Sequence, residues 1–153
     1  MIILLNKIKK KFLIIDYDPE TIVNLAKEDI ECRYGDASDS ELLNELNFSK
    51  AKMVYSTIPD FDTNVMLVDT IRRSSKNAII IVVSHQIDEA IELYEKGATY
   101  VLMPHFLGGR HTSTLIERYG LDLNKFLKEK TTHIEHLRTR KNIGHEHPKR
   151  ERH

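Results

Sequence analysis

Short apolar runs alternate along the chain with stretches of helical periodicity, and this alternation is the strongest constraint on the fold. Continuous runs of strand length occupy residues 12–15, 53–55, 78–83 and 100–103, and a more polar, edge-like run occupies 30–34. Between them, apolar residues recur at helical spacing, as at Ile87, Ala90 and Ile91. Strands that alternate with helices predict an α/β fold with a mostly parallel sheet, and the continuous apolar run at 12–15 predicts a strand buried on both faces.

Several helix boundaries are marked by residues that cap or stop helices. Asp18 and Pro19 predict a helix start, because Asp accepts a hydrogen bond from the first backbone N–H groups and Pro fits the first turn. Ser38 and Glu41 have the spacing of a capping box. Gly97 predicts the end of the helix before the last strand.

The character of the chain changes after Pro104. Gly108 and Gly109 predict a flexible joint before two further helices, the first ending near Tyr119 and the second starting near Asn124. The charged, polar C-terminus predicts disorder. We therefore expect three parts, a domain over 1–120, a C-terminal helix over 121–141 and a disordered basic tail over 142–153.

Composition argues against several classes of protein. The 23 Lys and Arg residues balance the 23 Asp and Glu residues, which argues against a nucleic-acid-binding protein. No apolar run reaches the ~18–20 residues that a membrane-spanning helix needs, and the first residues lack the pattern of a signal peptide. The single cysteine, Cys32, cannot form an internal disulfide, which is typical of a reducing compartment. We expect a cytoplasmic protein.

An acidic residue stands at the carboxyl end of the first predicted strand. Asp16 follows the apolar run directly, and ligands of parallel α/β sheets bind at the carboxyl ends of strands. A carboxylate there can accept hydrogen bonds from both hydroxyls of a nucleotide ribose. The alternative is that Asp16, like Asp18, only begins the turn into the next helix.

Acidic and small residues also follow the next two strands. Asp36 and Ala37 come after the 30–34 run, where the Asp36 carboxylate can accept a hydrogen bond from an adenine amino group. A simple turn before the next helix is the alternative. Ser56 and Thr57 end the 53–55 run, and their small side chains let a ligand approach the backbone. Three consecutive strand ends of this kind indicate a ligand site more strongly than any one of them.

These residues, in this order, resemble the RCK domain, also called the KTN or TrkA-N domain. The resemblance covers about residues 12–117 and rests on three segments and one further residue: Phe12–Glu20, Tyr34–Asp39, Ala51–Thr57 and Asn64. The later segment Glu92–Pro104, with Leu107 to Gly109, is most similar to versions attached to Kef-type cation/proton antiporters.

The resemblance implies a Rossmann-like domain that binds NAD(H), ATP/ADP or a related nucleotide and performs no chemistry. By matching position, Asp16 would hold the adenosine ribose and Asp36, beside Ala37, the adenine. Ser56 and Thr57 would line the pocket. The resemblance also implies a homodimer at the cytoplasmic face of the membrane, where nucleotide binding regulates a potassium channel or a cation/proton antiporter.

The chain departs from the family at its start. Family members begin with a strand and a G-x-G-x-x-G turn whose backbone N–H groups bind phosphates, and this sequence has neither. Residues 2–8 are similar to the second half of the helix that follows this turn. The absent strand is central in the family's sheet. Its loss predicts a gap between the 12–15 and 53–55 strands, with two exposed edges. Either the chain is a fragment of a longer protein, or another segment fills the gap.

Two enzyme-related or signalling classes fit the sequence less well. A phosphoacceptor receiver domain needs a lysine before the proline of the last strand and an aspartate after the middle strand, but Met103 and Ser56 stand there. A short-chain dehydrogenase needs a Tyr-x-x-x-Lys pair, which this sequence lacks. The alternative function that stays open is a Rossmann-type NAD-dependent enzyme, or a nucleotide-binding subunit with no transport partner.

Histidines are concentrated near the C-terminus. His133 and His136 have a helical spacing that suits a shared metal ion, but structural and catalytic metal sites need further convergent ligands. Because they lie beside arginines and lysines, a polar exposed tail is the favoured interpretation. We expect no metal site.

Overall fold

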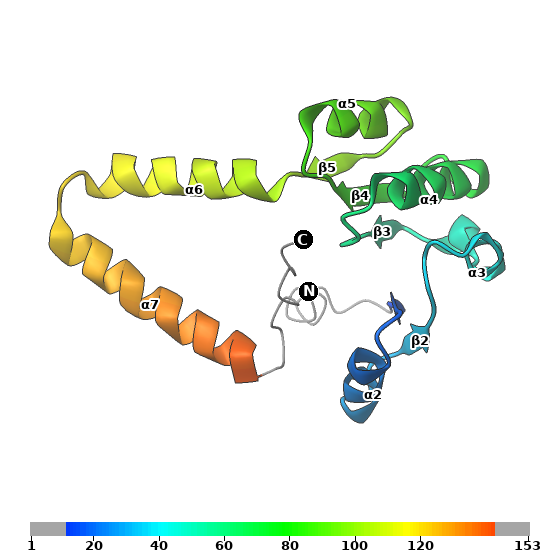
Figure 1. Cartoon of the computed structure of the whole chain (residues 1–153), viewed down its shortest axis with the longest axis horizontal. Coiled ribbons are helices and arrows are strands. Elements are labelled where there is room, and N and C mark those ends of the chain that lie inside the picture. The colour runs from blue at the N-terminus through cyan, green and yellow to red at the C-terminus, as the bar shows by residue number, and fades with distance from the viewer. Residues whose placement is uncertain (1–11, 143–153) are drawn as a thin grey trace, which may run out of the picture. The chain divides into compact units, whose positions relative to one another are not determined.

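The computed structural model of the chain describes residues 12–142, along which helices and strands alternate (Figure 1). The chain divides into two units, residues 1–105 and 106–153, and each is described by itself. The strands of the first unit are β1 (Ile14–Asp16), β2 (Cys32–Tyr34), β3 (Met53–Tyr55), β4 (Ile79–Val83) and β5 (Tyr100–Leu102). Its helices are α2 (Pro19–Lys27), α3 (Ser40–Glu45), the 3₁₀ turn η1 (Phe48–Lys50), α4 (Phe61–Ser74) and α5 (Ile87–Glu95).

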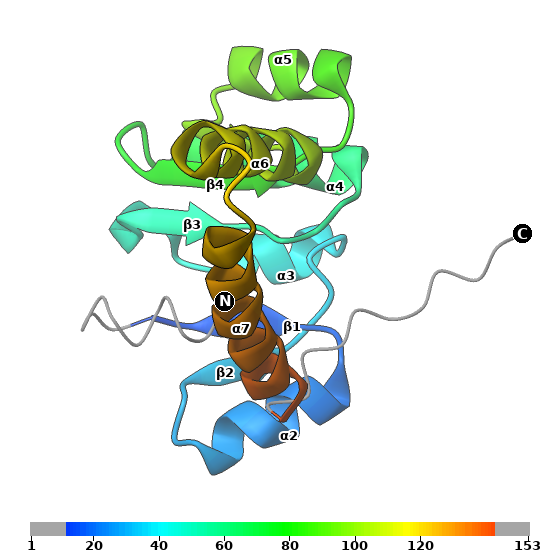
Figure 2. The same ribbon diagram turned by 90° about the vertical axis from the view of Figure 1, so that its left-hand side faces the viewer.

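The described strands form two parallel sheets, with the orders β1-β2 and β3-β4-β5. In Figure 2, β3 and β4 lie side by side in one sheet, and β1 and β2 in the other. Every strand pair is parallel, which confirms the predicted α/β class. Among the described residues β1 and β3 do not pair with each other.

Helices α4 and α5 pack on the three-stranded sheet and on each other, and the main core lies between them. Val68 and Ile71 of α4 meet Ile80 and Val82 of β4, and Leu93 of α5 completes the group; all five are fully buried. Burying side chains of this size supplies about 1.5–3 kcal/mol each. The core therefore fixes the three-stranded sheet and the loops at its carboxyl edge.

Burial is uneven along β4, whose last residue, Val83, is buried like Ile80 and Val82. Ile80 and Val82 are fully buried, whereas Ile79 is 42% exposed and Ile81 is half-buried. The physical reason is that α4 and α5 contact each other and therefore cover the same face. The other face is more open among the described residues, although the sequence of the strand is apolar throughout.

Aspartates cap three helices of the first unit, and one of them corrects the sequence analysis. Asp18 caps α2 as predicted, and its side chain accepts from the N–H of Glu20. For α3 the cap is Asp39, which accepts from the N–H of Glu41 at 2.8 Å. The predicted capping box is therefore wrong by one residue, because Asp39 stands directly before the first helical residue and binds this N–H group.

The second unit is a helical hairpin, and its first helix begins earlier than predicted. Helix α6 (Pro104–Tyr119) runs through Gly108 and Gly109, so the predicted flexible joint is wrong. Proline fits the first turn of a helix, and two glycines weaken a helix of 16 residues without breaking it. Gly120, at φ +55°, ends α6 as predicted.

Helix α7 (Leu123–Asn142) follows the turn. The Tyr119 and Phe126 rings pack edge to face at 5.4 Å, and the Tyr119 hydroxyl donates to Glu129 at 2.9 Å, which holds the hairpin together. No helix within residues 12–142 combines the length and the apolar character needed to cross a membrane. The predictions for residues 2–8 and for the tail after residue 142 fall outside the described part of the chain.

Candidate functional site

The carboxyl ends of β1 and β2 lie next to each other and carry the two predicted aspartates. Asp16 is in register with Tyr34, and the N–H of Gly35 donates to the Asp16 carbonyl at 3.0 Å. Asp36 is therefore two residues beyond the pair that contains Asp16. Both aspartates thus stand at the edge of the sheet where parallel α/β folds bind ligands.

The Asp16 side chain is half-buried and takes part in a turn. One carboxylate oxygen accepts from the N–H of Asp18 at 2.9 Å, which leads the chain into α2. The second oxygen has no hydrogen-bond partner among residues 12–142. Asp16 therefore serves the turn with one oxygen, while the other is not engaged by these residues.

Asp36 is exposed and held by a similar turn. Its Oδ1 accepts from the N–H of Ser38 at 2.8 Å, and this backbone hydrogen bond lowers the pKa of the Asp36 carboxyl. The carboxylate is therefore ionised at neutral pH and accepts, but does not donate, hydrogen bonds. A Cβ at Gly35 before it would lie 2.5 Å from a terminal methyl group of Leu42 in α3, so a larger residue there requires this side chain to shift.

The two residues at the end of β3 have different environments. Ser56 is buried, donates its hydroxyl to Asn64 Oδ1 at 2.7 Å and accepts from the N–H of Ile58 at 3.2 Å. Thr57 is exposed. Ser56 therefore shapes the loop after β3, and Thr57 is the one of the two whose side chain is open to a ligand.

Asn64 is a structural member of this region that the sequence analysis left without a role. It is fully buried, and its Nδ2 donates to the Ile58 carbonyl at 2.8 Å and the Val83 carbonyl at 3.0 Å. These bonds join the loops after β3 and β4. The sequence indicates its burial in one way: it stands four and seven residues before Val68 and Ile71, on the apolar face of α4.

The predicted residues are brought together in two groups rather than one. Asp16 and Asp36, with half-buried Ala37, belong to the two-stranded sheet, and Ser56 and Thr57 follow the edge of the three-stranded sheet. Two surface hollows lie along α4 and α5, and neither is lined by these residues. Within residues 12–142 no three His, Cys, Asp or Glu side chains converge on a position for a metal ion.

Parallel strands, crossover helices and polar residues at the carboxyl ends of the strands define a Rossmann-like α/β domain. The TrkA-N domain family matches residues 1–104 of the 153. The chain belongs to this family. The resemblance seen in the sequence is thereby confirmed.

One curated relative is the glutathione-regulated potassium-efflux system protein KefC of Escherichia coli O139:H28 (strain E24377A / ETEC). It is 30% identical to this chain over 112 residues, which are 72% of this chain. The match covers 18% of the relative's own length. The chain thus corresponds to a small part of that protein.

Solved structures support the same fold. The TrkA-N domain of the inner membrane protein YbaL from Escherichia coli matches with a TM-score of 0.68 and 22% identity, over 74% of this chain and 84% of that one. The GsuK channel bound to NAD matches with a TM-score of 0.56 and 22% identity, over 67% of this chain and 18% of that one. At these identities the likeness concerns the fold.

Proposed function

We propose that this chain is a non-catalytic regulatory domain that binds an adenine nucleotide, NAD(H) or ATP/ADP, and thereby controls a cation transport protein. The observation that carries the proposal is the pairing of Asp16 with Tyr34, which places Asp16 and Asp36 at adjacent strand ends. Membership of the TrkA-N family and the solved GsuK channel bound to NAD support the choice of ligand.

Each predicted residue has a role in this proposal. The free oxygen of Asp16 accepts from the ribose hydroxyls, and Asp36 accepts from the adenine amino group. Ala37, half-buried beside Asp36, leaves room for the flat base. On the other sheet, Thr57 faces the ligand and Ser56 holds the loop that carries it.

The described residues fit the adenosine part of such a ligand better than its phosphates. Two acceptor carboxylates suit a ribose and an amino group, whereas they repel phosphate. The backbone N–H cradle of a G-x-G-x-x-G turn is missing from the sequence. We therefore expect the adenosine part to supply most of the binding free energy at these residues.

The site favours binding over catalysis. The Asp36 carboxylate accepts a hydrogen bond from the Ser38 N–H, which lowers its pKa. The Cys32 thiol is half-buried and donates to the Ile22 carbonyl at 3.6 Å. Neither group forms an acid–base or nucleophile–base pair with another side chain among the described residues.

The partner of this domain is a membrane protein that moves potassium or another cation. The relative KefC is a potassium-efflux protein by name, and this chain corresponds to 18% of its length. We place the domain at the cytoplasmic face of the membrane, where it acts on a transporter or channel. Within the chain we assign the regulatory domain to residues 1–120, followed by the C-terminal helix, which in the structure ends at Asn142, one residue beyond the predicted 141.

A homodimer would use the open face of α7. Leu123, Leu127, Ile134 and Leu137 are spaced in the four-and-three pattern of a coiled-coil seam, with Lys130 at the central position. All four apolar side chains are between 36% and 68% exposed. The packing with α6 uses Phe126 instead, so the seam is available to a second copy of the chain.

Isothermal titration with NADH, ATP, ADP and AMP tests the proposal. Asp16→Asn keeps the turn acceptor and removes the charge, and we expect it to weaken binding by ~1–3 kcal/mol, as for a lost hydrogen bond to a charged group. Asp69→Asn, an exposed site on α4, is the matched control and should bind normally. No heat of binding for any nucleotide, or equal affinity in Asp16→Asn and the natural chain, would contradict the proposal.

A further inference from the structure

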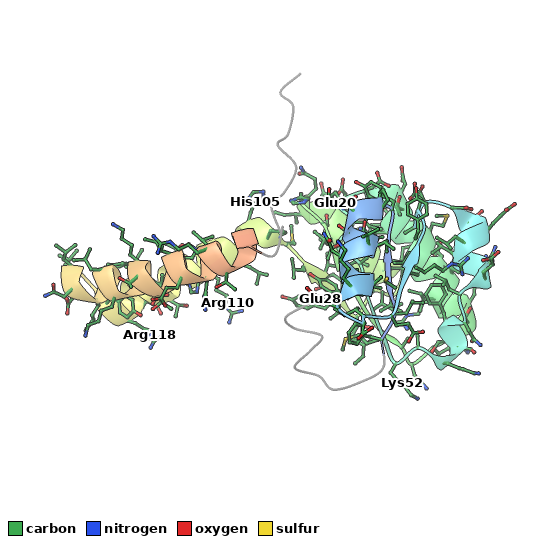
Figure 3. All side chains as sticks on the ribbon, turned by 90° about the horizontal axis from the view of Figure 1, so that it is seen from below. Glu20, Glu28, Lys52, His105, Arg110 and Arg118 are labelled. Atoms are coloured by element: carbon green, nitrogen blue, oxygen red, sulfur yellow. The ribbon has the colours of Figure 1, made fainter. Side chains whose placement is uncertain are left out.

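Two histidines lie side by side at the carboxyl edge of the three-stranded sheet. The N–H of Ser84 donates to the Leu102 carbonyl at 3.1 Å, so the chain segments leaving β4 and β5 are adjacent. His85 follows on one segment and His105, in the first turn of α6, on the other (Figure 3 labels His105). Their ring centroids are 5.7 Å apart with an interplanar angle of 61°.

Both imidazoles are available to a ligand from solvent. His85 is half-buried and His105 is exposed. None of the hydrogen bonds formed by the described residues involves a ring nitrogen of either histidine, so their lone pairs are unoccupied there. Neutral imidazole is a common protein ligand for transition-metal ions.

We propose that His85 and His105 together bind one divalent transition-metal ion. A metal–nitrogen bond of about 2.0–2.1 Å puts an imidazole centroid about 3.2 Å from the ion. Two such rings lie about 5.2 Å apart at a tetrahedral angle and about 6.4 Å apart when opposed, and the observed 5.7 Å falls between these values. The edge-to-face arrangement requires the rings to turn, and the broad χ2 preference of histidine permits this at low cost.

The site supplies two protein ligands, and this number determines which kind of metal site it can be. Within residues 12–142 no third His, Cys, Asp or Glu side chain converges with them, so water completes the coordination. Structural zinc sites have four protein ligands, so this ion exchanges with solvent. Imidazole selects Cu²⁺, Ni²⁺ and Zn²⁺ over Mg²⁺ and Ca²⁺. A bound ion ties the first turn of α6 to the loop after β4.

Copper titration of the full chain, followed by amide NMR spectra, tests the site. Paramagnetic Cu²⁺ broadens signals near its ligands, which separates this pair from the histidines near the C-terminus. We expect the amides of residues 84–86 and 105–106 to broaden together, with one apparent affinity. Mg²⁺ should cause no change at either segment.

The variants His85→Gln and His105→Gln decide whether the ion is shared. If the ion is shared, each variant should lower the apparent Cu²⁺ affinity measured at the other segment by about tenfold or more, since it removes one of two ligands. His111→Gln, an exposed histidine further along α6, is the matched control and should leave both segments unchanged. Independent broadening of the two segments, or broadening confined to the C-terminal histidines, overturns the proposal. Dispersed spectra of each variant show that it is folded.

Discussion

The Ser56 hydroxyl donates to Asn64 Oδ1 over 2.7 Å, and both side chains are buried. The Asn64 amide nitrogen then donates to the Ile58 and Val83 carbonyls, so one asparagine satisfies three groups on two loops. A buried polar group without a hydrogen-bond partner destabilises the fold. This network therefore stabilises the two loops at the edge of the sheet.

The first prediction concerns this asparagine. Asn64→Ala should lower the free energy of unfolding by about 2–4 kcal/mol, because the buried Val83 carbonyl, the part-buried Ile58 carbonyl and the Ser56 hydroxyl lose their partner. Urea unfolding measures the loss. Asn124→Ala, at the exposed start of α7, should change stability by less than about 0.5 kcal/mol. Equal effects of the two substitutions would show that the network contributes nothing.

A second prediction concerns Arg72, which joins the ends of several elements. Its guanidinium donates to the carbonyls of Gly97 and Ala78, both at 2.8 Å, and to the Thr99 hydroxyl at 3.2 Å. Arg72→Met should lower the free energy of unfolding by about 2–3 kcal/mol, since these carbonyls lose a charged donor.

Arg72→Lys should restore only part of this stability, because an ammonium group cannot reproduce the planar fork of a guanidinium. The neighbouring Arg73 is exposed and bonds only the Thr70 hydroxyl among the described residues, so Arg73→Met is the control with a small effect. Thermal unfolding of all three variants makes the comparison. If Arg72→Lys matches the natural chain, the fork geometry has no role.

The sequence predicted the parallel strands well because apolar runs bounded by capping aspartates and glycines have few alternative structures. It did not predict features that depend on long-range packing. Burial of β4 depends on α4 and α5 lying on one face, and the strand itself carries no record of this. Asp16 and Asp36 follow strands and were identifiable as a pair, whereas the role of Asn64 depends on two loops that only folding brings together.

The third prediction contrasts two glycines that look alike in the sequence. Gly97 has φ +107° and a Cβ there would lie 3.1 Å from Arg72 Nε, so Gly97→Ala should destabilise the chain by about 1–2 kcal/mol. Gly108 lies in α6 with nothing within 4 Å, and Gly108→Ala should stabilise it by about 0.5–1 kcal/mol. Differential scanning calorimetry gives both signs, and a destabilised Gly108→Ala would mean that α6 needs a glycine there.

The fourth prediction concerns acid. The hydrogen bond from the Thr63 hydroxyl, and then that from the Thr63 N–H, lower the pKa of Asp60 from its ordinary value of 3.8. A carboxyl whose pKa is lower in the folded state stabilises the fold above the unfolded value, and this contribution is lost as pH falls through the folded value. Stability should therefore fall below about pH 4.

Melting temperatures measured from pH 7 to pH 3 test this assignment. Asp60→Asn should be less stable at pH 7 and should lose less stability on acidification than the natural chain. Asp69→Asn, an exposed change on the same helix, should follow the natural curve. An unchanged acid slope in Asp60→Asn would assign the acid sensitivity to other carboxyls, of which Asp18 and Asp36 also have lowered pKa values.

The last prediction concerns the seam of α7 that we assign to the homodimer. Ile134→Glu replaces one of the four apolar side chains of the seam by a charge, and burying two such carboxylates in a dimer costs several kcal/mol. Light scattering after gel filtration should then show a monomer, whereas we expect a dimer for the natural chain. Thr132→Glu adds the same charge to an exposed position off the seam and should remain dimeric. A monomeric natural chain, or a dimer that survives Ile134→Glu, would exclude this helix as the interface. Circular dichroism of both variants separates loss of the dimer from loss of the helix.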